Sequence, residues 1–137
     1  MTAKEFLRQY EELNRRAYRY QQEYKTELEK VDAIGSTLAG DGMPHGSGIS
    51  RRTEDKAIRL ADKAAKWKAA ELDALQKRQE IFEVIHDIDG IEGDILYERY
   101  INLLTWEQIA ERLYYSDSGL YYAHQRALAI VEGRLNE

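Results

Sequence analysis

Hydrophobic and aromatic residues recur at alternating steps of three and four along the first quarter of the chain. The series comprises Phe6, Tyr10, Leu13, Ala17, Tyr20 and Tyr24, then drifts through Leu28, Val31 and Ile34 and stops at Gly35. Such steps place side chains on one face of a helix, with the spacing of a coiled-coil seam. We therefore predict a long helix over residues 1–34, beginning near Thr2.

The next segment, GSTLAGDGMPHGSGIS, breaks this pattern. It holds five glycines and the only proline of the chain. Glycine gives the backbone unusual freedom, and proline removes an amide donor that a helix interior needs. A flexible glycine-rich loop is therefore predicted over residues 35–52, either as the hinge of a hairpin or as a disordered tether.

A second series with the same spacing follows the loop. It comprises Ile58, Ala61, Ala65, Lys68, Leu72, Leu75, Gln79 and Phe82, with two polar interruptions. Thr53, followed by two acidic residues, is suitable for a helix start. We predict a second long helix over residues 53–89. Neither stripe is wide enough for a stable single helix, so the two helices should pack as an antiparallel hairpin or against a second copy of the protein.

The remaining segment, residues 91–137, has the pattern of a helix-turn-helix domain. Ile95, Leu96, Tyr100 and Ile101 indicate a short helix after Gly90 and Gly93. Thr105 and Gln108 have the spacing of a capping box, so a further helix should begin there. The small side chain of Ala110 would let a following helix cross closely.

The turn and the last helix carry further signals. Ser116 is a good N-cap, and apolar residues then repeat at helical spacing, which predicts a recognition helix from Asp117 to Leu135. Tyr114 stands where a left-handed residue, usually glycine, is preferred, so we expect a longer turn variant. The fold class is thus all-α, with a long antiparallel, coiled-coil-like hairpin followed by a C-terminal helix-turn-helix.

Polar and aromatic side chains on the recognition helix are the candidate DNA contacts. Their hydroxyls, amides and one guanidinium suit phosphates and base edges. These candidates are Ser116, Ser118, Tyr121, Tyr122, Gln125 and Arg126. A solvated or dimer-contacting face is the alternative for the tyrosines.

Charge restricts how such a protein would bind DNA. The chain has a net charge of −5, which argues against sequence-blind coating of nucleic acid. From Ile91 onward there are four arginines against eight acidic residues. The denser positive runs lie elsewhere, in residues 15–19 and 51–68, where they either contact the DNA backbone or form a solvated helix surface. Binding should therefore be localised and sensitive to salt.

Several classes of function lack any sequence signal. The chain has no cysteine, its three histidines are scattered, and no nucleotide-binding, nucleophile-elbow or zinc-protease motif occurs. We expect no enzymatic activity, metal or cofactor. The polar N-terminus does not resemble a signal peptide, and no apolar run suits a bilayer, so we expect no membrane association and a cytoplasmic location, in a bacterial host cell.

The string RYINLLTWEQIAERLYYSDSGLYYAHQRAL, starting at Arg99, resembles the C-terminal part of the RinA and ArpU type of phage and prophage transcription regulators. The shared residues include Thr105-Trp106-Glu107, Ile109-Ala110 and Tyr115-Ser116, and the segment Met43-Pro44-His45-Gly46 is similar to that family's inter-helical segment. The resemblance implies a sigma-region-four-like helix-turn-helix and a phage-encoded late-gene activator. In sigma-like domains the start of the recognition helix is commonly rich in arginine, whereas this chain has Gly119, Tyr121 and Tyr122.

Three functions follow from these patterns. The first is a sequence-specific DNA-binding transcription regulator that binds double-stranded DNA and RNA polymerase and forms a homo-oligomer, with a dimer as the simplest case. The second is a helical interaction protein that binds RNA polymerase or a host factor without reading DNA. The third is a DNA adaptor like the small subunit of a phage terminase, which would form a ring-shaped oligomer.

Overall fold

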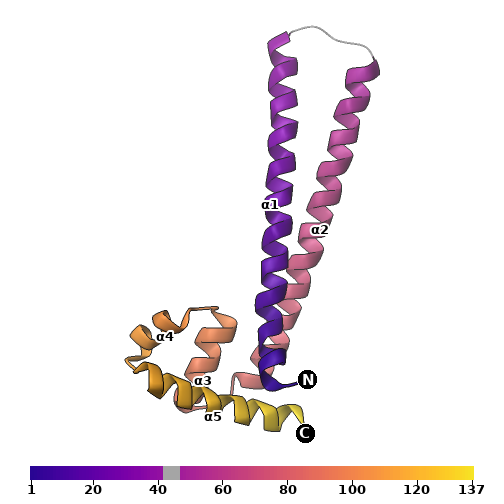
Figure 1. Cartoon of the computed structure of the whole chain (residues 1–137). Coiled ribbons are helices and arrows are strands. Elements are labelled where there is room, and N and C mark those ends of the chain that lie inside the picture. The colour runs from indigo at the N-terminus through magenta and orange to yellow at the C-terminus, as the bar shows by residue number, and fades with distance from the viewer. Residues whose placement is uncertain (42–46) are drawn as a thin grey trace. The chain divides into compact units, whose positions relative to one another are not determined.

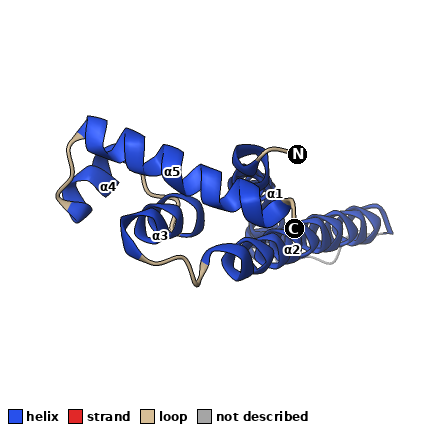
Figure 2. Cartoon of the chain, turned by 90° about the horizontal axis from the view of Figure 1, so that it is seen from below, coloured by secondary structure: helices blue, strands red, loops and turns tan. Residues whose placement is uncertain are grey.

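The structure, a computed structural model, describes residues 1–41 and 47–137 (Figure 1). All regular elements of the described residues are helical (Figure 2). They are α1 (Ala3–Asp41), α2 (Ser47–Ile85), α3 (Gly90–Leu96), the π-helical turn η1 (Tyr97–Ile101), α4 (Trp106–Leu113) and α5 (Asp117–Leu135). The predicted all-α class with a long helical hairpin is confirmed. Within this described part, no helix combines the length and the apolar character needed to span a bilayer.

The predicted loop over residues 35–52 is wrong in its bounds. Helix α1 continues through Gly35 and Gly40 to Asp41, and α2 already begins at Ser47. Glycine disfavours a helix interior by only about 1 kcal/mol per residue, so isolated glycines need not end a helix. Residues 42–46, which contain the whole Met43-Pro44-His45-Gly46 segment, lie outside the described residues.

The second long helix ends four residues before its predicted end at Asp89. The last turn closes with a hydrogen bond of 3.1 Å from the Ile88 amide to the Ile85 carbonyl. Gly90 then takes a φ of +77°, a conformation that glycine adopts at no steric cost. The chain therefore leaves α2 soon after its apolar series ends at Phe82 and begins α3 at Gly90.

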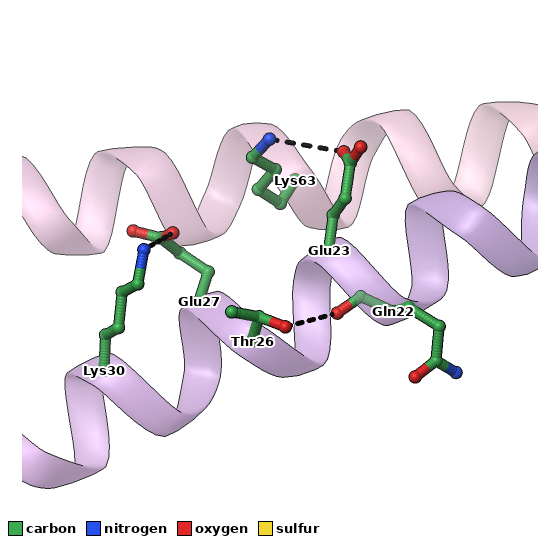
Figure 3. A network of polar contacts seen from close by, with 6 residues as sticks. All are labelled: Gln22, Glu23, Thr26, Glu27, Lys30 and Lys63. Carbon is green, nitrogen blue, oxygen red and sulfur yellow. Dashed lines mark hydrogen bonds and ion pairs between the residues drawn. The ribbon is translucent and has the colours of Figure 1, made fainter.

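The chain forms two compact units, which we call the hairpin unit (Asn14–Leu72) and the helix-turn-helix unit (Met1–Leu13 with Asp73–Glu137). In the hairpin unit, α1 and α2 pair through aromatic and charged side chains. The rings of Tyr24 and Trp67 lie 5.4 Å apart between centroids. Lys63 Nζ lies 3.2 Å from Glu23 Oε2, and on α1 the buried Glu27 faces Lys30 at 3.7 Å (Figure 3).

The predicted seam of α1 is confirmed in the hairpin unit. Ala17 is buried, and Tyr20, Tyr24, Leu28 and Val31 are partly buried. These residues share the face that packs on α2 through Tyr24. The alternating spacing therefore identified the inner face of α1.

The predicted stripe of α2 does not supply the contact with α1 in the hairpin unit, although its last member, Phe82, packs in the core of the helix-turn-helix unit. Ile58, Ala61, Ala65 and Leu72 are all exposed, while Trp67 and Ala70 turn inward. Helix α2 carries a second apolar series, also at steps of three and four, which includes Leu60, Ala64, Trp67 and Ala70. This series contains the large indole ring, which buries more apolar area than an alanine or isoleucine side chain, so the helix turns its Trp67 face inward.

In the helix-turn-helix unit, α5 connects two hydrophobic clusters. Its second half contributes Ala127 and Val131 to a cluster with the first turns of α1, the last turns of α2 and η1. Its first half contributes Leu120 and Ala123 to a cluster with Ile95 of α3 and Ile109 of α4. Because one rigid helix serves both clusters, the position of α5 is set along its whole length.

Candidate nucleic-acid interface

Helix α4 begins with the predicted capping box. Thr105 Oγ1 accepts from the Gln108 amide at 3.2 Å, and the Thr105 amide donates to Gln108 Oε1 at 2.9 Å. These two bonds satisfy amides that the first helical turn leaves without partners. Ile109 is buried and Ala110 packs against the same cluster, so α4 is anchored to α5 near the predicted crossing point.

The turn between α4 and α5 is short, and the expected longer variant is wrong. Only Tyr114, Tyr115 and Ser116 separate the two helices, and Tyr114 itself is left-handed, with φ 57° and ψ 45°. This conformation costs a non-glycine residue about 1–2 kcal/mol. The Tyr114 side chain is 94% exposed and meets little steric resistance, while the buried cluster on either side holds the two helices in place.

Helix α5 begins at the predicted N-cap and has the predicted bounds. Ser116 Oγ accepts from the Gly119 amide at 3.1 Å. A β-carbon at Gly119 would lie 3.1 Å from Ser116 Oγ and 3.2 Å from the Tyr115 ring, so glycine permits a close approach of the turn to the helix. The Ser116 side chain is thus committed to capping, although it remains exposed.

Four of the candidate DNA contacts lie on one exposed face of α5. We call these four exposed residues the α5 polar face. They follow one another at steps of three, one and three: Ser118, Tyr121, Tyr122 and Gln125. The Tyr121 and Tyr122 side chains are 59% and 63% exposed and meet edge to face, with centroids 5.4 Å apart. Leu120 and Ala123 occupy the opposite, buried side. The fold therefore presents this face outward on a well-anchored helix.

Arg126 lies beside this face but is engaged in an ion pair. Its Nε donates to Glu92 Oε1 at 2.9 Å, and this hydrogen bond holds the pKa of the Glu92 carboxyl below its usual value. Arg112 and Arg134 are paired in the same way, with Glu98 and Asp87. Three of the four arginines that the sequence places in this segment thus already have acidic partners.

A basic cleft next to the α5 polar face was not predicted. It has a volume of about 340 Å³. Its lining includes Lys4 and Arg8 of α1, Arg99 of η1, Trp106 of α4, and Tyr121 and Gln125 of α5. No local pattern links Lys4 or Arg8 to residues more than ninety positions away, so sequence reasoning had no signal for this cleft.

The π-helical turn and the loop after it shape one wall of the basic cleft. Arg99 donates to the Leu104 carbonyl at 2.8 Å, and its guanidinium lies 5.3 Å from the centre of the Trp106 ring. Leu103, with φ 56°, reverses the chain between them. Guanidinium groups at this distance from an indole are attracted by its ring electrons. The Arg99 side chain is therefore held in place beside the cleft.

Buried Tyr100 and His124 lie at the base of the cleft. Burial raises the pKa of Tyr100 to about 12. Burial, followed by the nearby charges of Lys4, Arg99 and Arg8, lowers the pKa of His124 to about 4. Both side chains are therefore neutral at pH 7. The His124 ring also meets Trp106 edge to face, with centroids 4.6 Å apart.

The described residues contain no cluster of three or more histidine, cysteine or acidic side chains able to hold a metal ion. The features available for chemistry are thus an exposed polar and aromatic helix face and a cationic cleft at its edge.

Comparison of the chain with protein-family models, with curated proteins and with solved structures finds no match.

Proposed function

We propose that this protein is a sequence-specific DNA-binding regulator of transcription, with α5 as its recognition helix. The observation that carries the proposal is the α5 polar face, presented by a helix that follows a three-residue turn and is capped by Ser116. Helices in this position of a helix-turn-helix enter the major groove with the residues of their N-terminal half. The phage origin and the late-gene activator role come from the family resemblance alone.

The chemistry of the polar face suits base readout. Gln125 has an amide that can pair with adenine in two hydrogen bonds, and the serine hydroxyl of Ser118 can serve either as donor or as acceptor. The two tyrosines add hydroxyls and apolar ring surface. A recognition helix of this type relies on base edges more than on charge, which agrees with its few cations.

The first experiment is recovery of genomic fragments bound by the full chain, followed by affinity measurements on a recovered duplex and a scrambled one. Tyr122→Ala and Gln125→Ala should reduce the preference for the recovered duplex, because base contacts specify sequence. Gln76→Ala, an exposed glutamine of α2, is the matched control and should leave this preference unchanged. A wild-type chain that shows no preference at low salt would contradict the proposal.

Arg126→Ala separates phosphate contact from base readout. If Arg126 leaves Glu92 to contact a phosphate, the variant should bind both duplexes more weakly, and the slope of log affinity against log salt should fall by about 1. Circular dichroism should show unchanged helix content for every variant. An equal loss of affinity for both duplexes, with an unchanged slope of log affinity against log salt, would show that Arg126 supports the fold and does not contact a phosphate.

The second candidate is an interaction protein that binds RNA polymerase or a host factor without reading DNA. The three arginine–carboxylate pairs favour it, because they engage every arginine of α4 and α5. Capture of a purified RNA polymerase by a chain with no DNA preference would support this function. A ring-shaped oligomer in a solution mass measurement would support the terminase-like adaptor instead.

We also propose that the protein is a homodimer that pairs through α2. The α2 outer stripe, which comprises Ile58, Ala61, Ala65, Leu72 and Leu75 and is interrupted by Lys68, is exposed along one face of this helix. Two antiparallel copies can be set about a two-fold axis so that Ile58 faces Leu75 and Ala61 faces Leu72 of the second copy. Each contact is then repeated by symmetry, as a two-fold interface requires, and the large leucine meets a small alanine.

Flanking charges agree with this pairing. In the same register, the acidic Asp62 and Glu71 beside the stripe come opposite Ala69 and Ala64 of the second copy rather than opposite like charges. Charged groups at such flanking positions determine partner choice and orientation between helices. The stripe therefore suits a second copy of this chain.

A further inference from the structure

The cations of the basic cleft are held in place by buried neighbours. Ala3 and Leu7 of α1 are 2% and 0% exposed in the first hydrophobic cluster, and the Ala3 amide donates to Glu132 Oε2 of α5 at 2.7 Å. Lys4 and Arg8 follow these two residues and lie one helical turn apart on the same side of α1. The packing that anchors α1 to α5 thus directs both cations to the edge of the α5 polar face.

The cations of the basic cleft differ from the other arginines of the helix-turn-helix unit in their ion pairing. The ion pairs of the described C-terminal segment engage Arg112, Arg126 and Arg134, and none of them involves the cations of the cleft. The lining contains three cations, Lys4, Arg8 and Arg99, against one carboxylate, that of Asp117. The cleft is thus a local positive site on a chain with a net charge of −5.

Aromatic side chains complete the lining. Trp106 and Tyr121 supply flat apolar surface, and Gln125 supplies an amide next to the cations. Cations beside aromatic rings are the combination that proteins use for a phosphate joined to a sugar and a base. Lys and Arg neutralise the phosphate, while the rings cover the less polar part of the nucleotide.

We propose that the basic cleft binds a phosphate ester, and that a backbone phosphate of the DNA contacted by α5 supplies it. The choice of DNA as the source rests on the proposed function. Lys4 and Arg8 then act from outside the helix-turn-helix, at the edge where Tyr121 and Gln125 are shared between the cleft and the α5 polar face. They supply the positive charge that the recognition helix itself lacks.

The test has a DNA arm and a nucleotide arm, both on the full chain. In the DNA arm, Lys4→Gln and Arg8→Gln should each weaken binding to recovered and scrambled duplexes alike. Each should lower the slope of log affinity against log salt by about 1, because one phosphate contact is lost. Lys25→Gln, which changes an exposed lysine of α1 in the hairpin unit and outside the two positive runs, is the matched control and should leave the slope unchanged.

In the nucleotide arm, Trp67→Phe leaves Trp106 as the single tryptophan, because the chain has only two. Adenosine monophosphate is titrated while Trp106 fluorescence is recorded. A saturable change that Lys4→Gln and Arg8→Gln weaken, together with the altered salt slope, supports the proposal. If the fluorescence change saturates but neither variant alters the salt slope of DNA binding, the cleft binds a free nucleotide. The proposal that a DNA phosphate occupies the cleft is then overturned.

Two outcomes separate this inference from the proposed function. If the wild-type chain prefers a genomic duplex but neither variant alters the salt slope and the nucleotide gives no change, the inference is overturned and the proposed function stands. If the chain binds the nucleotide but no DNA, the proposed function fails and the phosphate site remains with a different source.

Discussion

The Tyr100 hydroxyl lies 2.7 Å from Nε2 of His124, and the two rings stack at 25° with centroids 5.9 Å apart. Both side chains are buried, and they join η1 to α5 across 24 residues of sequence. Because a buried polar group without a partner is costly, this hydrogen bond lets both residues remain in the core. The pair thus links the π-helical turn to α5, and both residues line the basic cleft.

The pair predicts a specific pH dependence of stability. The folded protein holds the His124 pKa at about 4, against 6.5 for the ordinary side chain, so the unfolded chain binds a proton at higher pH. The free energy of unfolding should therefore fall as the pH drops from about 6.5 to about 4, and this contribution should be constant above 6.5. Thermal unfolding across this pH range measures the effect.

The matched variants are His124→Gln and His86→Gln. The first removes the titrating ring from the core and should flatten the dependence between pH 4 and 6.5, although it also lowers stability at pH 7. The second changes an exposed histidine and should keep the wild-type profile. A His124→Gln variant with the full wild-type pH dependence would show that other groups produce it.

A pair of glycines offers a test of the close approach at the start of α3. A β-carbon at Gly93 would lie 1.8 Å from the Ile88 carbonyl oxygen, a backbone atom that no side-chain rotation can move away. Gly93→Ala should therefore force a backbone shift and destabilise the fold by roughly 1–3 kcal/mol or more. Urea unfolding followed by circular dichroism measures the change.

Gly133→Ala is the matched control for this substitution. Gly133 lies within α5, and nothing stands within 4 Å of an added β-carbon. Alanine is favoured over glycine in a helix interior by about 1 kcal/mol, so this variant should be slightly more stable than the wild type. Similar effects of the two substitutions would mean that the contact between Gly93 and Ile88 does not form.

Release of Arg126 from its ion pair should increase DNA affinity if the proposed function is right. Glu92→Gln removes the carboxylate that accepts from Arg126 at 2.9 Å and also removes one negative charge near α5. We expect tighter binding to every duplex and a steeper dependence of log affinity on log salt, by up to about one unit. Fluorescence anisotropy at several salt concentrations measures both.

Glu98→Gln provides a comparison for Glu92→Gln, because it changes the net charge equally and frees Arg112 instead. Arg112 lies on α4 and not on the proposed recognition helix, so its release should have the smaller effect. Equal effects of the two variants would indicate a response to net charge alone. Unchanged affinity for Glu92→Gln would leave Arg126 without a role in phosphate contact.

The proposed dimer predicts a mass change upon substitution of the α2 outer stripe. Leu72 is 55% exposed, so Leu72→Lys should leave the monomer folded while it introduces charge into the pairing surface. Analytical ultracentrifugation should show a dimer for the wild type and a monomer for the variant. Glu29→Lys, an exposed position on α1, should remain dimeric. A monomeric wild type would rule out the pairing.

The local features of the C-terminal helices followed from the sequence alone. The Thr105 and Gln108 capping box, the Ser116 cap and the bounds of α5 each depend on side chains within three or four positions of the amides that they satisfy. Such interactions form wherever the rest of the chain lies. The inner face of α1 was predictable because this helix has one clear apolar seam.

The tertiary structure decided the features that depend on competition between distant residues. Helix α2 has two apolar series at helical steps of three and four, and the contact of Trp67 with Tyr24 selects the face that turns inward. Arg126 meets Glu92 across 34 positions, which changes a free cation into a paired one. The basic cleft combines Lys4 and Arg8 with Tyr121, because burial of Ala3 and Leu7 brings the first turns of α1 to α5. Periodicity describes which side chains share a helix face, whereas packing free energy over the whole unit determines what that face contacts.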